Sequence, residues 1–77
     1  MPKLPSVTAR QLLRTLNRLG FIRHAASRGS HLVLVHADGR RAVIPVHARD
    51  IPAGTLMAII KDLRLTKADF VELMRRK

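Results

Sequence analysis

The chain contains no cysteine, no tryptophan and no tyrosine. Without cysteine it can form no disulfide, no thiolate zinc site and no cysteine nucleophile. Its two phenylalanines offer few rings on which nucleobases could stack. Acidic residues are also scarce, because five Asp and Glu stand against fifteen Lys and Arg, for a formal net charge of +10. Such a basic chain is expected to bind polyanions, with nucleic acid favoured over an acidic protein or a membrane surface.

Long apolar runs are missing as well. The longest, residues 32–35 and 56–60, fall far short of the roughly 20 residues that cross a bilayer. The N-terminus lacks the apolar stretch of a signal peptide. These features predict a cytoplasmic protein without a membrane partner. The length of 77 residues predicts a single domain over residues 1–77, with residues 1–6 irregular.

Two segments have the pattern of a capping box, in which the first and fourth side chains cap each other's backbone N–H groups. They are residues 8–11 (TARQ) and 66–69 (TKAD). The helical spacing of the leucines after the first box predicts a helix over residues 9–19. A second helix is expected around the apolar positions of residues 56–63, and a short third helix follows the second box.

Three short strands are predicted between the first two helices, over residues 21–27, 31–36 and 40–46. Residues 38–39 (Asp-Gly) favour a two-residue turn that joins the last two strands. Pro45 cannot donate a ladder hydrogen bond, so the third strand should lie at an edge of the sheet or end there.

A two-residue turn would fix the register of this hairpin. It pairs His31 with Val46 and places His31 on the same face as Ala42 and Ile44. The other face would carry Leu32, Leu34, His36, Arg41 and Val43. Both faces are mainly apolar, so the sequence leaves open which of them packs on the helices.

The predicted order, α-β-β-β-α-α, indicates an α+β fold. In such a fold a small antiparallel three-stranded sheet carries helices on one face. This is the topology of double-stranded-RNA-binding-like folds.

The four histidines raise the question of a metal site. His31 and His36 are five positions apart on one predicted strand and therefore point to opposite faces. His24 and His47 lie on other segments, and no cysteine or nearby glutamate completes a ligand set. We therefore expect no metal and no cofactor, and we interpret His24 and His36 as structural or solvated.

An ordered set of short motifs extends along nearly the whole chain, from about residue 8 to residue 74. In chain order they are Gly20-Phe21, Gly29-Ser30-His31, Ile44-Pro45-Val46-His47, Gly54-Thr55-Leu56, Ile59-Ile60-Lys61 and Asp69-Phe70. Each motif is weak alone, but the set at these spacings resembles the HicA toxin family of bacterial toxin–antitoxin modules.

The resemblance implies a small endoribonuclease that cleaves mRNA and inhibits translation and growth. It implies a double-stranded-RNA-binding-like fold, an essential histidine that falls on His31, and a HicB-like antitoxin that covers this site. RNA can be cut without a metal because its own 2′-OH can attack the neighbouring phosphate, and a histidine can transfer the protons near neutral pH. The candidate RNA-binding residues are Arg23, Arg28, Ser30, Arg41, His47 and Arg49.

Two other functions explain the charge without a catalytic role for His31. One is a non-catalytic RNA-binding module of the same double-stranded-RNA-binding-like topology. The other is a basic protein that binds only an acidic partner. Growth arrest on expression, with new ends in cellular RNA, would separate the nuclease from both.

Overall fold

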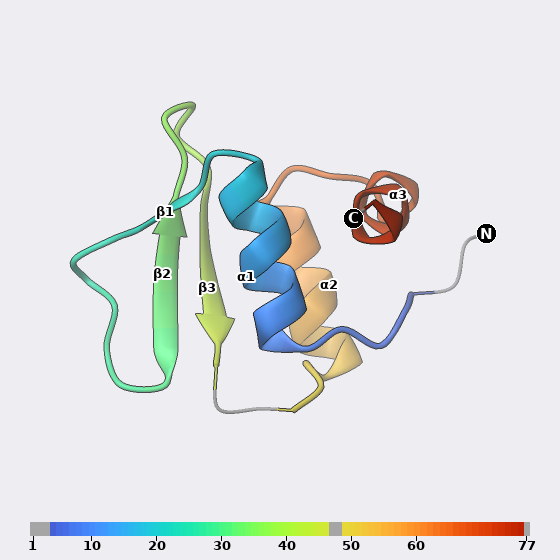
Figure 1. The fold of residues 1–77 in the computed structure, drawn as a ribbon, viewed down its shortest axis with the longest axis horizontal. Coiled ribbons are helices and arrows are strands. Elements are labelled where there is room, and N and C mark those ends of the chain that lie inside the picture. Colours follow the sequence, from blue (N-terminus) through green and yellow to red (C-terminus); the bar gives the residue numbers. More distant parts are fainter. Residues whose placement is uncertain (1–3, 47–48, 77) are drawn as a thin grey trace.

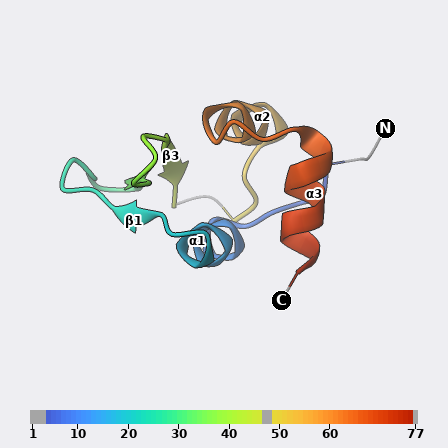
Figure 2. The same cartoon turned by 90° about the horizontal axis from the view of Figure 1, so that it is seen from above.

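The computed structural model of the chain describes residues 4–46 and 49–76. Its elements are α1 (Ala9–Arg18), β1 (Ile22–Arg23), β2 (His31–Val35), β3 (Arg41–Pro45), α2 (Ala53–Asp62) and α3 (Lys67–Arg75). The three strands form an antiparallel sheet in the order β1-β2-β3, and the helices lie to one side of it (Figures 1 and 2). The predicted α+β fold and its element order are confirmed.

Reciprocal side-chain caps start α1 and α3. The Thr8 hydroxyl accepts from the Gln11 backbone N–H at 3.1 Å, and Gln11 Oε1 accepts from the Thr8 N–H at 2.9 Å. Thr66 and Asp69 make the same pair of bonds at the start of α3. Both predicted capping boxes are therefore confirmed. By contrast, the N-cap of α2 is Pro52, and no side-chain hydrogen bond caps this helix.

The core fills the space between the sheet and the helices. Its most deeply buried side chains are Phe21, Phe70, Leu12, Leu16, Ile44, Leu56, Ile60, Leu63 and Val7. Phe70 is the one fully buried residue of α3, so this side chain anchors the third helix to the rest of the core. No helix among the described residues has the length and hydropathy that a membrane span requires.

The β2–β3 hairpin differs from the sequence prediction by one position of register. His31 pairs with Pro45 rather than Val46, because the loop has three residues and not two. The His36 N–H donates to Arg40 O at 2.9 Å, and the Gly39 N–H donates to His36 O at 3.0 Å. Gly39 has φ +97°, the left-handed conformation of a type I turn followed by a bulge. The Asp-Gly signal was correct, but it belongs to this longer turn.

A shift of one residue exchanges the two faces of a strand relative to its neighbour. The face that packs on the helices carries Leu32, Leu34, Ala42 and Ile44, and the open face carries Ile22, His31, Val33, Val35, Arg41, Val43 and Pro45. The prediction that His31 shares a face with Ala42 and Ile44 is therefore wrong. Pro45 is the last residue of β3, which is an edge strand as predicted.

β1 is much shorter than the strand predicted over residues 21–27. After Arg23 the chain turns, because His24 Nδ1 accepts from the Ala26 N–H at 2.9 Å and the Ser27 N–H donates to His24 O. Ser27 Oγ then accepts from the Val33 N–H at 2.9 Å. The Ser27 hydroxyl thus takes the place of a ladder partner for the Val33 N–H, in the middle of β2.

Two side chains at the tip of the β2–β3 hairpin hold the C-terminal ends of two helices. His36 Nε2 lies 3.0 Å from Leu19 O, the C-cap carbonyl of α1, and Arg40 Nη1 donates to Leu63 O, the C-cap carbonyl of α2, at 3.0 Å. Asp38 steadies Arg40 through an ion pair of 2.9 Å. The Arg40 backbone N–H that donates to Asp38 lowers the pKa of this carboxyl below its ordinary value of 3.8, with help from the Arg40 side chain.

Candidate active site

His31 is the first residue of β2, and its side chain is exposed on the open face of the sheet. Its backbone is held on both sides. The His31 N–H donates to Arg28 O at 2.8 Å and the Arg28 N–H donates to His31 O at 2.9 Å, while Pro45 of β3 pairs across the sheet. A side chain on such a rigid element can be presented to a substrate in a fixed position.

The two bonds between Arg28 and His31 close a tight turn with Gly29 and Ser30 in the middle. Gly29 has φ +51°, whereas Ser30 has no positive φ, as in turns that carry glycine at the first central position. The glycine of the Gly-Ser-His motif thus has a structural role in the turn, in addition to the chemical role expected of the histidine. The glycine makes the turn that ends at the histidine.

Replacing Gly29 by alanine should destabilise this turn. The added Cβ would meet no neighbouring atom within 4 Å, so the effect comes from the backbone conformation alone. An L-residue held at this φ costs about 1–2 kcal/mol. Chemical denaturation of Gly29→Ala should show a loss of this size. The matched control is Gly54→Ala. Gly54 lies in α2 without a positive φ, so this change should not destabilise the protein.

The predicted cationic residues divide into two groups around His31. Arg28 is exposed next to it in the tight turn. Arg49 is exposed and comes three residues after Val46, whose N–H donates to Ser30 O of the same turn. Arg41 lies on the same face but pairs with Val35, four residues along the strand, or about 13 Å away at 3.3 Å per residue. The fold therefore brings Arg28 to the His31 end of the sheet and leaves Arg41 at the other.

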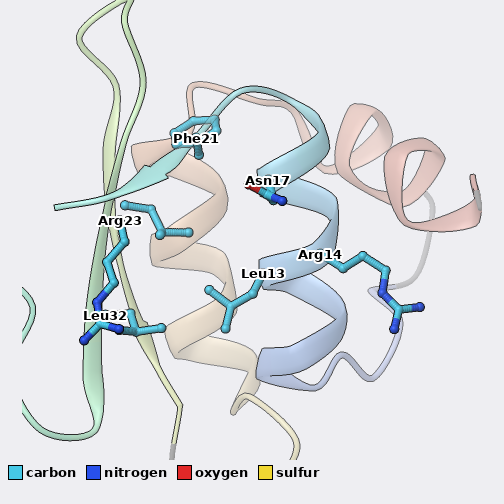
Figure 3. Close-up of a pocket in the computed structure, with 7 residues that line it drawn as sticks. Leu13, Arg14, Asn17, Phe21, Arg23 and Leu32 are labelled. Carbon is cyan, nitrogen blue, oxygen red and sulfur yellow. The ribbon is translucent and has the colours of Figure 1, made fainter.

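Arg23 lies on the helix-facing side of the sheet, paired with Leu34. It lines a cavity of about 350 Å³ between α1 and the β1–β2 edge, together with Leu13, Arg14, Asn17, Phe21, Leu32 and Leu34 (Figure 3). In this view the Arg23 side chain extends along β2 towards Leu32, the residue after His31. Its guanidinium is thus directed to the same end of the sheet as the histidine.

The remaining polar candidates have different surroundings. Ser30 is half-buried, and its carbonyl oxygen accepts from the Val46 N–H at 2.7 Å, so its backbone helps to join the turn to the chain after β3. His24 and His36 each hold the local backbone through Nδ1, which agrees with a structural role. His47 lies outside the described residues. Within residues 4–46 and 49–76 no three His, Asp or Glu side chains gather where a metal ion could be held.

The comparison with known families decides what kind of protein carries this site. A family model described as the HicA toxin of bacterial toxin–antitoxin systems matches residues 9–65. The chain belongs to the HicA toxin family. A search of curated proteins finds no match to it. The family resemblance deduced from the motifs is confirmed.

The HicA match covers α1, the whole sheet and α2, and it ends before α3 begins at Lys67. His31 and its turn lie inside the matched range. Membership of a toxin family of toxin–antitoxin systems gives the chain a toxin role and implies a cognate antitoxin as its partner.

One residue of the site was missed from the sequence. Ser27 Oγ accepts from the Val33 N–H at 2.9 Å and donates to His24 O at 2.8 Å. It therefore fixes the loop before His31 against β2. A serine near a turn is too common to be singled out, and only the fold shows that its hydroxyl faces a strand.

Proposed function

We propose that this HicA-family protein is an endoribonuclease that cleaves mRNA and thereby inhibits translation and growth, with His31 as the proton-transfer residue. The observation that carries the proposal is the exposed imidazole at the start of β2. The turn with Gly29 leads directly into this strand, and Arg28 is exposed beside the imidazole. Family membership supports the toxin role.

The proposed chemistry uses a nucleophile that RNA carries itself. The 2′-OH attacks the adjacent phosphorus and the 5′ oxygen leaves, so a 2′,3′-cyclic phosphate and a free 5′-OH are formed. His31 either accepts the 2′-OH proton, with water protonating the 5′ oxygen, or protonates the 5′ oxygen, with water accepting the 2′-OH proton. Arg28, with Arg23 or Arg49, neutralises the extra charge on the phosphate oxygens. No step requires a metal ion.

We also propose that the antitoxin is HicB-like and inhibits by covering His31. The open face of the sheet that carries His31 also exposes apolar side chains, with Ile22 64 % and Val43 41 % accessible. An apolar surface with a cationic end matches a partner with an apolar centre and acidic groups around it. Binding there would hide the histidine and the apolar patch together.

The test is cleavage of an RNA and of the same sequence with every 2′-OH methylated, both in excess EDTA. The purified protein should cut the RNA and leave 2′,3′-cyclic phosphate ends. The methylated strand should be bound but not cut, because its nucleophile is blocked. Expression in bacteria should arrest growth, and the cognate antitoxin should restore it.

Two results would refute the proposed mechanism. Cleavage of the methylated strand would show that water or another external nucleophile attacks the phosphorus. Cleavage that stops in EDTA and returns with a divalent cation would show that a metal ion is required. Growth arrest without any new RNA ends would assign the toxin another target.

A further inference from the structure

A second basic groove lies between α1 and α3. It has a volume of about 390 Å³ and is lined by Gln11, Arg14, Thr15, Arg18, Met74, Arg75 and Arg76. Four of these seven residues are arginines, and all four are exposed. In Figure 3 the Arg14 side chain points away from the sheet, on the side of α1 where α3 lies. The groove is therefore separated from His31 by α1 and the sheet.

Within residues 4–46 and 49–76 no ion pair joins a groove arginine to an Asp or Glu. In the described part of the chain the ion pairs are both made by Asp38, at the hairpin tip. The lining contains no Asp or Glu. Four guanidinium groups around one groove repel one another, and a bound polyanion would relieve this repulsion.

One hydrogen bond organises the groove. Arg18 Nη2 donates to the backbone oxygen of Arg76, the C-cap of α3, at 3.2 Å. This bond joins the C-terminal end of α3 to α1 and holds one guanidinium between the two helices. Arg14 lies one helical turn before Arg18, about 6 Å along the axis, so the cations follow one another along the groove.

We propose that this α1–α3 groove is a binding site for the phosphate backbone of single-stranded RNA, separate from the His31 site. The inference rests on the proposed function, because it extends the contact with the same substrate. The longest dimension of the protein is 36 Å. About ten nucleotides span that length even at the 3.4 Å per nucleotide of a stacked strand, so one RNA can reach both sites.

The lining favours RNA over an acidic protein segment as the occupant. Guanidinium groups bind phosphate oxygens through paired N–H donors, and a row of them matches a ligand with regularly spaced charges. A protein segment would also need apolar pockets for its anchoring side chains, and Met74 is the only large apolar residue of the lining. Since the groove has no aromatic residue, its binding should not depend on base sequence.

The family comparison sets this groove apart from the His31 site. Met74, Arg75 and Arg76 lie beyond the residues matched to the HicA family, whereas His31 lies within them. One wall of the groove therefore lies outside residues 9–65, which the family model matches.

The experiment compares Arg75→Gln/Arg76→Gln with wild type in binding a uniformly 2′-O-methylated single strand of about 20 nucleotides. Arg18 is left unchanged because it holds α3, and Arg14 because it also lines the cavity beside β1. Each lost contact to a single strand should reduce the slope of log K against log salt by about 0.7. The double variant should therefore bind about 25-fold more weakly at 0.1 M salt, with a slope shallower by about 1.4.

The matched control is Lys61→Gln/Lys67→Gln. It removes two positive charges from another surface groove, of about 360 Å³, between α2 and α3. Its RNA affinity should stay within about threefold of wild type, because charges beyond about 10 Å are screened at this salt concentration. Thermal melting of both variants checks that α3 stays in place. With unmodified RNA, the groove variant should have a raised KM and an unchanged kcat.

Two outcomes would refute the groove as an RNA-binding site and leave the proposed function intact. In one, the wild type cleaves RNA and the groove variant binds and cleaves as the control does. In the other, the groove variant keeps its RNA affinity but loses affinity for the antitoxin, which makes the protein partner the occupant. A wild-type protein that neither binds nor cleaves RNA would refute the proposed function as well.

Discussion

His31→Ala should lower the rate of RNA cleavage by about 10²–10⁴-fold, the contribution expected of a general acid or base. The same change should leave the melting temperature within a few degrees of wild type. His31 is exposed at the start of β2, and surface substitutions of this kind change the free energy of unfolding by about 0.5 kcal/mol or less. Growth arrest should be lost together with cleavage. Rate and melting temperature are measured on one purified sample.

A matched control is His24→Ala, which removes another exposed imidazole. Its Nδ1 accepts from the Ala26 N–H, so the change should lower stability slightly and keep cleavage near the wild-type rate. If His31→Ala is folded and cuts RNA as fast as the wild type, His31 is not the proton-transfer residue. If its activity falls only in proportion to unfolding, His31 has a structural role.

Phe21→Ala should remove a large part of the stability of the protein. Phe21 is 1 % exposed, its ring centroid lies 5.0 Å from that of His36, and the Arg40 guanidinium carbon lies 5.1 Å from the ring centre. Truncation of a buried phenylalanine costs about 3–5 kcal/mol. A domain of this size has only about 4–12 kcal/mol in total. Thermal melting should show a decrease in Tm of about 12–40 °C.

The neighbouring residue provides the control for this substitution. Ile22 is 64 % exposed on the open face, so Ile22→Ala should change the free energy of unfolding by less than about 1 kcal/mol. Equal losses for the two variants would mean that the open face is covered in solution, for example by a second copy of the chain. A small loss for Phe21→Ala would mean that the core around the hairpin tip is loosely packed.

The parts of the fold that depend on near neighbours in the chain could be predicted from the sequence. Thr8 and Thr66 begin helices through bonds to residues three positions away, and these bonds form as the pattern indicates. The hairpin shows the limit of such reasoning. An Asp-Gly pair fits both a two-residue and a three-residue turn, and only the packing of Leu34 and Ala42 on the helices selects the longer one.

The candidate site was predictable in part for the same reason. His31 and Arg28 lie in one tight turn, so their proximity follows from the sequence. Arg41 was also predicted to bind RNA, but strand pairing places it opposite Val35, at the other end of β2 from His31. The α1–α3 groove could not be predicted, because it depends on where Phe70 and the Arg18–Arg76 bond place the third helix.

The tip of a hairpin is usually where a small sheet begins to fray, because its last hydrogen bonds are the most exposed to water. Here His36 and Arg40, on either side of the loop, hold the C-cap carbonyls of Leu19 and Leu63. Opening the tip would therefore also release the last turns of α1 and α2. We therefore expect the hairpin end of the sheet to have no low-energy route to opening on its own. It opens together with both helices, as one cooperative unit.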